Sequence, residues 1–176
     1  MTPKRYHFAL VTFHWLLAVL LLVALGMGSL VLQHIPNESP DKINALRGHM
    51  VAGGLILILT LIRLAVRLKT SHPTPASTGN IMLDRLAVLA HYGLYLLVVL
   101  MAASGIALSI QANLPAAVFA GTAALPASFE DFAPRLGHGL IAKALIALIT
   151  AHILAALYHQ FVRRDGLLSR MWFGGK

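Results

Sequence analysis

The stretch from Leu136 to Val162 reads LGHGLIAKALIALITAHILAALYHQFV, and it decides the class of fold. It is apolar over more than the about 20 residues that a helix needs to cross the hydrocarbon core of a bilayer. Its apolar residues are continuous and do not alternate with polar ones, as they would in a half-buried strand. Arg163, Arg164 and Asp165 end the run. We therefore predict a transmembrane helix over residues 136–162.

Three further runs share this length and character, over residues 8–32, 43–68 and 83–110. The backbone must satisfy its own hydrogen bonds in lipid, so such runs are helices or strands of a closed barrel, and continuous apolar character favours helices. The first run is longer than the about 7–15 apolar residues of a signal peptide, so we expect it to be retained. The chain is predicted to be an all-α integral membrane protein, with residues 1–176 forming a single domain, a four-helix transmembrane bundle.

The connections between the four runs differ in character. Residues 36–41 form a polar turn with two prolines, and residues 70–80 form a loop rich in Pro, Ser and Thr. Residues 111–135 hold three prolines and several large apolar residues. A connection of that length is usually functional or disordered. Its apolar content favours a segment that lies on, or dips into, the membrane surface.

The composition excludes an ordinary water-soluble protein. Of the 176 residues, 58% are hydrophobic and 11% are charged, whereas soluble domains carry roughly 25% charged residues. The mean hydropathy is +0.77. The chain has no Cys and nine His. The missing Cys excludes disulfides, Cys-based zinc sites, iron–sulfur clusters and covalently attached haem of the Cys-x-x-Cys-His type.

The net charge is +8, and most of the basic residues lie on one side of the predicted bundle. Ten basic residues fall on the side of both termini and four on the opposite side: Lys4, Arg5, Arg63, Arg67, Lys69, Arg85, Arg163, Arg164, Arg170 and Lys176 against Lys42, Arg47, Arg135 and Lys143. Basic residues mark the cytoplasmic side, so both termini are predicted to be cytoplasmic. The charge is an orientation signal with contacts to anionic lipid, and we do not expect nucleic acid as a partner.

The histidines divide by their depth in the predicted spans. His7, His34 and His72 lie at or outside helix ends, and we interpret them as solvated or interfacial. The remaining six lie within or at the margins of spans: His14, His49, His91, His138, His152 and His159. Ionisable residues inside a membrane are costly, which makes these six functional candidates.

The fourth run fixes the heights of its histidines. His138 and His152 are 14 residues apart, which corresponds to a rise of about 21 Å at ~1.5 Å per residue. At ~100° per residue they project from nearly the same helix face, because 14 steps fall about 40° short of four turns. His159 follows seven residues later on that face. Helix geometry thus places His138 and His152 at opposite levels of the bilayer.

Depth also selects partners on other helices. The second helix enters from the side opposite the termini, so His49 lies level with His138. The first helix enters from the side of the termini, so His14 and His152 meet at a similar inner level. The sequence therefore predicts two interhelical pairs, His49–His138 on the outer side and His14–His152 on the inner side.

Two facing imidazoles are the axial ligands that a six-coordinate haem b needs, and the apolar macrocycle suits an apolar bundle. Zinc takes four ligands in a tetrahedral cluster, which two separated pairs fit poorly. The alternative for each intramembrane His alone is an interhelical hydrogen bond. Gly48, Gly53 and Gly54 would let a bulky ring approach the backbone, or would serve helix–helix contact.

Basic residues near the pairs have two interpretations as well. Arg47, Arg63 and Lys143 are candidate partners for haem propionates, and the alternative is an Arg that snorkels to the interface from a helix end. Lys42, Arg47 and Arg135 are the cations available on the outer side to attract an anionic donor.

Short motifs in all four runs resemble the bacterial cytochrome b561 family. They are Phe13-His14-Trp15-Leu16, Gly48-His49 followed by Gly53-Gly54, His91 with Tyr95, and His138 with His152 and His159. Their order and the 14-residue spacing carry the resemblance, which covers nearly the full chain. It implies a multi-pass protein of the bacterial inner membrane with two b haems, ligated by His14/His152 and His49/His138.

The resemblance also implies a function. Family members move electrons between the periplasmic face and the quinone pool, and one branch oxidises superoxide and reduces ubiquinone. We expect a periplasmic one-electron donor, with superoxide as a candidate, and ubiquinone as acceptor on the cytoplasmic side. His91 and His159 are candidates for the quinone site, because a quinone carbonyl needs a hydrogen-bond donor and its reduction needs protons. Their alternative role is ligation of the inner haem.

Two other functions remain open from the sequence. The chain is either the oxidoreductase itself or a cytochrome b anchor subunit that links a periplasmic dehydrogenase to the quinone pool. A non-redox alternative is a His-based metal-ion or proton transporter, although repeated halves and broken midplane helices are not evident in the sequence.

Overall fold

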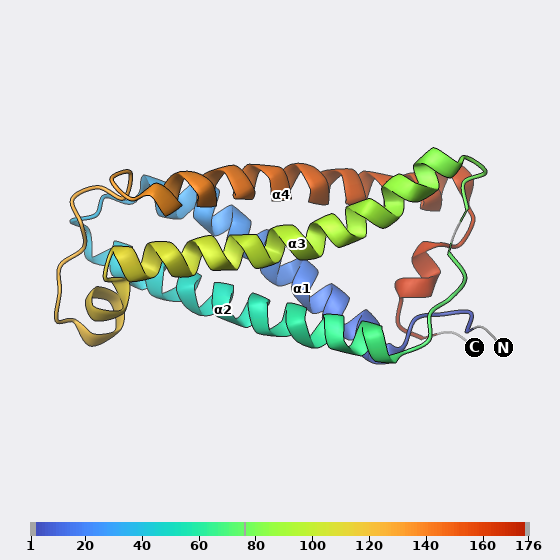
Figure 1. The fold of residues 1–176 in the computed structure, drawn as a ribbon, viewed down its shortest axis with the longest axis horizontal. Helices are drawn as coiled ribbons and strands as arrows, with labels where there is room; N and C mark the ends of the chain where they lie inside the picture. The colour runs from blue at the N-terminus through green and yellow to red at the C-terminus, as the bar shows by residue number, and fades with distance from the viewer. Residues whose placement is uncertain (1–2, 76, 175–176) are drawn as a thin grey trace.

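A computed structural model describes residues 3–75 and 77–174. Four long helices run side by side (Figure 1). They are α1 (Phe8–Gly26), α2 (Pro40–Lys69), α3 (Ile81–Gln111) and α4 (Ala133–Leu157). A π-helical turn, Met27–Val31, and a 3-10 turn, Leu32–His34, extend α1, and the π-helical turn Tyr158–Arg163 extends α4. Each of the four segments is long and apolar enough to cross a membrane, which confirms the predicted bundle.

Three helices begin earlier than predicted, and local caps explain the difference. Ser39 caps α2 by accepting a hydrogen bond from the backbone N–H of Asp41, so Pro40 and Asp41 belong to the helix and not to the predicted turn. Asn80 caps α3 in the same way. Pro134 lies in the first turn of α4, where a proline loses no helical hydrogen bond. The predicted starts at residues 43, 83 and 136 were therefore two to three residues late.

The helices alternate in direction, so both termini and the α2–α3 loop lie at one end of the bundle (Figure 1). We call this the terminal end. The opposite end, called the far end, carries the α1–α2 and α3–α4 connections. The prediction that both termini share one side is confirmed, and the assignment of that side to the cytoplasm stays a prediction.

The core of the bundle is a layer of aliphatic side chains at mid-length. It contains Leu17 and Leu25 of α1, Ile56 of α2, Val98 of α3 and the fully buried Leu145 of α4. Large apolar side chains cover the outside, where Val19, Leu22 and Leu96 are 53–59% exposed. Such a surface suits lipid, because soluble proteins rarely expose contiguous apolar area on this scale.

The α3–α4 connection folds onto the N-terminal end of α2. Its π-helical turn Ala116–Ala120 buries Ala117 and Val118 against Leu46. The Arg47 side chain donates two hydrogen bonds to the carbonyl of Val118, at 3.1 and 2.6 Å. The apolar content of residues 111–135 is thus used in part for packing inside the protein, and the location of the segment at the membrane surface stays a prediction.

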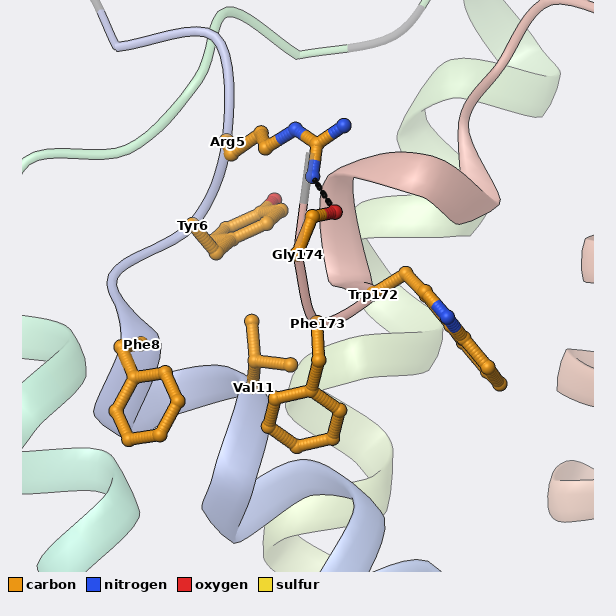
Figure 2. A pocket seen from close by; sticks show the side chains of 7 residues that line it. All are labelled: Arg5, Tyr6, Phe8, Val11, Trp172, Phe173 and Gly174. Carbon is orange, nitrogen blue, oxygen red and sulfur yellow. Dashed lines mark hydrogen bonds between the residues drawn. The ribbon is translucent and has the colours of Figure 1, made fainter. Parts of the chain in front are cut away.

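The two ends of the chain meet at the terminal end around a pocket of about 170 Å³ (Figure 2). The Arg5 side chain donates to the carbonyl of Gly174 at 2.6 Å, and the rings of Phe8 and Phe173 are 5.9 Å apart. Trp172 points away from this group and packs against Trp15, whose indole N–H donates to Met171. None of the six predicted site histidines lines the pocket. Its lining residues fall within 5–11 and 172–174, so the pocket belongs to the packing contact between the N-terminal and C-terminal segments.

Candidate functional site

The structure brings the four predicted partner histidines together as two pairs. The ring centroids of His49 (α2) and His138 (α4) are 6.1 Å apart at the far end, with the rings at 74° to each other. Those of His14 (α1) and His152 (α4) are 6.2 Å apart nearer the terminal end, at 70°. The proximity predicted from helix depth is confirmed, and the role of these residues as ligands stays a prediction.

Heptad spacing along α4 sets the vertical arrangement of the pairs. Leu145 lies seven residues after His138 and seven before His152, and it is fully buried in the aliphatic layer. At ~1.5 Å per residue, this layer stands about 10 Å from each histidine along the helix. The two pairs are therefore separate sites at the two ends of one apolar core.

The geometry of each pair fits a metal held between two rings. A metal–imidazole bond is about 2.0–2.1 Å long, so two rings on opposite sides of one metal place their centroids roughly 6–6.5 Å apart. The observed 6.1 and 6.2 Å agree with that arrangement. No group of three or more His, Cys, Asp or Glu that would hold a metal occurs in the described chain. Two-ligand sites of this kind suit the axial positions of haem.

Hydrogen bonds at the far-end pair fix the orientation of the His138 ring. The hydroxyl of Ser104 donates to the carbonyl of Met101 at 2.9 Å and lies 3.0 Å from Nδ1 of His138. Since that hydroxyl proton is already used, we assign the second contact as Nδ1–H donating to Ser104. The lone pair of the imidazole then lies on Nε2, as metal ligation through that atom requires.

The partner ring of His49 has a buried Nδ1 with no hydrogen-bond partner in the described structure. A buried polar atom without a partner is rare and costly, which points to a missing ligand or water at this level of the bundle. The atom belongs to the ring that faces His138.

Two glycines outside the predicted set leave space for the imidazole rings of the far-end pair. A Cβ at Gly105 would meet Cε1 of His138 at 3.2 Å, and one at Gly28 would meet Cε1 of His49 at 3.3 Å. At Gly48, Gly53 and Gly54, by contrast, an added Cβ meets no described protein atom within 4 Å. Tight helix–helix contact does not explain these three glycines, and the approach of a bulky ring stays a prediction.

His91 of α3 lies beside the inner pair. Its ring centroid is 5.3 Å from that of His152, shorter than the spacing of rings on opposite sides of one metal. Its Nδ1 is 2.6 Å from the carbonyl of Ala87, to which it donates, and the side chain is exposed. His91 is thus next to the inner pair without occupying a place in it.

His159 contacts an acidic partner that the sequence did not suggest. Its Nδ1 lies 2.6 Å from a carboxylate oxygen of Asp165, which Arg163 approaches at 3.4 Å. The hydrogen bond from His159, followed by one from the backbone N–H of Leu167, lowers the pKa of Asp165. Asp165 is therefore ionised at neutral pH. The described structure records no contact between His159 and His91, so these two candidates are not brought together.

The three remaining histidines follow the prediction in two cases. His7 caps α1 by accepting from the N–H of Ala9, and His34 bonds to the carbonyl of its own turn; both are exposed. His72 is partly buried in the α2–α3 loop, and its interpretation as solvated or interfacial stays a prediction. Its Nε2 is buried and has no hydrogen-bond partner in the part of the chain that the structure describes. Its ring packs 6.0 Å from that of Tyr6, because the α2–α3 loop folds against the N-terminal segment.

The three predicted outer cations, Lys42, Arg47 and Arg135, contact other groups of the protein. Lys42 is 5% exposed and donates to the carbonyls of Leu32 and Ile35, both at 2.8 Å. Arg47 bonds to Val118, as described above, and Arg135 lies 3.4 Å from Glu130. Two of the three predicted outer cations therefore stabilise the loops at this end.

Comparison with known proteins supplies the family. A sequence model described as prokaryotic cytochrome b561 matches residues 5–174. The chain is 30% identical to cytochrome b561 homolog 2 of Escherichia coli (strain K12), over 97% of this chain and 92% of that protein. It is 31% identical to the probable superoxide oxidase CybB of Yersinia pestis, over 96% of each chain. It is 29% identical to cytochrome b562 of Cereibacter sphaeroides, over 92% of this chain and 90% of that protein.

Proposed function

Because this chain belongs to the prokaryotic cytochrome b561 family of membrane cytochromes b, we propose that it carries electrons across the bacterial inner membrane. The donor is a one-electron reductant in the periplasm, and the acceptor is ubiquinone on the cytoplasmic side. The far end of the bundle faces the periplasm in this proposal, and the terminal end faces the cytoplasm, in agreement with the excess of basic residues there.

The observation that supports the proposal is the presence of two ring pairs at 6.1 and 6.2 Å, one toward each end of the core. We assign one b haem to His49/His138 and a second to His14/His152. When bound, each haem supplies a reversible one-electron change at iron. Ser104 orients His138, and the glycines at positions 28 and 105 leave room for the far-end imidazoles.

Ubiquinone is proposed to bind at the terminal end, with His159 donating to a quinone carbonyl. Asp165 accepts the Nδ1–H of His159 at 2.6 Å. In the imidazolium form, which the carboxylate stabilises, the Nε2–H is then the donor to the quinone carbonyl. Reduction of one ubiquinone to ubiquinol takes two electrons and two protons, and an imidazole held against a carboxylate is suited to pass protons. His91, beside His152, is the second candidate for this site.

Superoxide is the donor that we propose for the periplasmic side. The similarity to a protein named probable superoxide oxidase supports it. The balanced reaction consumes two superoxide anions, one ubiquinone and two protons, and it yields two O₂ and one ubiquinol. In this role the chain is an oxidoreductase in its own right, and it needs no catalytic partner subunit.

Stopped-flow mixing of the purified haem-loaded protein with superoxide, with and without ubiquinone, tests this function. We expect fast haem reduction by superoxide and reoxidation when ubiquinone is present. Haem that superoxide leaves oxidised, while a co-purifying dehydrogenase reduces it, would favour the anchor subunit. Purified protein without a haem absorption band would favour the non-redox transporter.

A further inference from the structure

Arg63 is a basic residue held inside the bundle. It lies six residues before the end of α2 at Lys69, which corresponds to about 9 Å along the helix axis. Its guanidinium donates to the hydroxyl of Tyr95 on α3, and its central carbon lies 5.4 Å from the centre of the Tyr95 ring. The side chain thus reaches across to a neighbouring helix and is not extended toward the solvent at the helix end, as a snorkelling Arg would be.

The positive charge of Arg63 has no carboxylate partner in the described chain. The ion pairs there use Glu130 and Asp165, and Asp84 accepts hydrogen bonds from Ser77 and Thr78. The Nε of Arg63 is buried and has no hydrogen-bond acceptor among residues 3–75 and 77–174. A guanidinium in an apolar interior is costly unless an anion completes the site, and the one side-chain hydrogen bond that the described structure gives Arg63 goes to the phenol of Tyr95.

The surroundings of Arg63 indicate where that anion belongs. His14 lies six residues after the start of α1 at Phe8, and Arg63 lies six residues before the end of α2 at Lys69, so both stand about 9 Å from the terminal end of two antiparallel helices that pack together. The ring of His14 faces that of His152, and Arg67 lies one turn from Arg63 on α2. All of these groups are neutral or positive, so the inner pair lies beside an uncompensated positive charge. A ligand that enters between His14 and His152 and carries an acidic group would supply what Arg63 lacks.

We propose that Arg63, positioned by Tyr95, binds a propionate carboxylate of the haem held by His14 and His152. This inference rests on the haem assignment made above. A guanidinium offers two parallel N–H donors that match a carboxylate, and such charged pairs are strong in a low-dielectric setting. Neither Arg47, which bonds to Val118, nor the exposed Lys143 has this combination of burial and missing partner.

The pairing has a consequence for the redox balance of the inner haem. Reduction adds one negative charge, and a nearby guanidinium stabilises the reduced form more than the oxidised one. Arg63 therefore raises the tendency of the inner haem to accept an electron, and it favours transfer from the far end toward the terminal end.

The experiment uses the His138→Ala background, in which only the inner haem is expected to remain. Arg63→Gln and the matched control Arg67→Gln, one turn nearer the helix end, are titrated potentiometrically by visible absorbance. We expect Arg63→Gln to shift the reduction equilibrium of the inner haem at least ten-fold toward the oxidised form, about 59 mV for one electron. Arg67→Gln should shift it less than two-fold.

Two additional variants keep the test decisive if Arg63→Gln binds no haem. Arg63→Lys should retain most of the potential, because the charge remains, and Tyr95→Phe should shift it in the direction of Arg63→Gln by a smaller factor. Infrared redox-difference spectra with haem labelled with ¹³C at the propionates provide the direct readout. The labelled carboxylate band should move in Arg63→Lys and Tyr95→Phe and stay in place in Arg67→Gln.

An inner-haem equilibrium that is the same in the Arg63 and Arg67 variants would overturn the inference while leaving the haem assignment intact. A shifted equilibrium with an unmoved propionate band would also overturn it, because Arg63 would then face another anion, such as a lipid phosphate. Failure of the assignment itself is distinguishable, since the His138→Ala background would then contain no inner haem.

Discussion

Ser104 Oγ lies 3.0 Å from Nδ1 of His138, and this contact joins α3 to the far-end histidine pair. Because the hydroxyl donates to the carbonyl of Met101, Ser104 acts as an acceptor for the imidazole and fixes its orientation. Partners of metal-bound histidines are worth about 10–100-fold in metal affinity. The contact therefore predicts that a side chain outside the proposed ligand set affects haem binding at one of the two proposed sites.

The first prediction concerns Ser104→Ala. We expect haem affinity at the far-end site to fall about 10-fold or more, because His138 loses the acceptor of its Nδ1–H. Haem titration of the apoprotein, followed by absorbance, measures the effect, and Ser109→Ala on the same helix is the control. Equal affinities in the two variants would show that the Ser104 contact has no role in haem binding.

A second prediction follows from the close approach of Gly105 to His138. Gly105→Val places a branched side chain where a Cβ alone would already lie 3.2 Å from Cε1 of the ring, so the imidazole must move. We expect loss of the far-end haem and retention of the inner one in the visible spectrum. Gly26→Val, at a position where the structure places no described protein atom within 4 Å of the added Cβ, should keep both. Retention of both haems in Gly105→Val would contradict the geometry proposed for His138.

Replacement of His159 separates quinone binding from haem binding. His159→Ala should retain both haems but reduce ubiquinone at a rate lower by about 10²-fold or more, the usual contribution of a group that transfers protons. Quinol formation is measured with chemically reduced protein, and the exposed His34→Ala serves as control. Loss of one haem in His159→Ala would instead identify His159 as a ligand.

The ion pair of His159 with Asp165 predicts a defined response to acid. The native pKa of Asp165 is lowered, chiefly by the hydrogen bond from His159. Its stabilising contribution is therefore complete above the unfolded-state pKa of about 3.9, and it is lost as pH falls through the lower native value. The difference in thermal midpoint between wild type and Asp165→Asn should shrink as the pH falls below about 4. A difference that stays the same between pH 5 and about pH 2 would contradict this origin of the stabilisation.

Much of the fold and of the site follows from sequence, because membrane thickness and helix rise constrain both. A run such as Leu136–Val162 has few alternatives to a spanning helix. Once the runs alternate in direction, the position of a residue within its run gives its depth. That is why the partners of His138 and His152 on other helices were predictable from spacing alone, and the structure places them at 6.1 and 6.2 Å.

What the sequence did not reveal depends on lateral packing and on loop paths. Ser104 and Gly105 matter because α3 lies against α4 with one particular rotation, which depth does not determine. Asp165 follows two arginines and was interpreted only as the end of a span, yet the chain turns back there and brings it to His159. The packing of His72 against Tyr6 was not predicted for the same reason, since a loop residue is buried or exposed according to where the loop runs.

The haem content per chain tests the central claim, that each of the two histidine pairs holds one b haem, most directly. It is measured by the pyridine haemochromogen absorbance against quantitative amino-acid analysis, in wild type, His138→Ala and His152→Ala. The account predicts two b haems in the wild type and one in each variant, with different visible spectra for the two variants. A wild type with one haem or none, or variants that keep both, would contradict it.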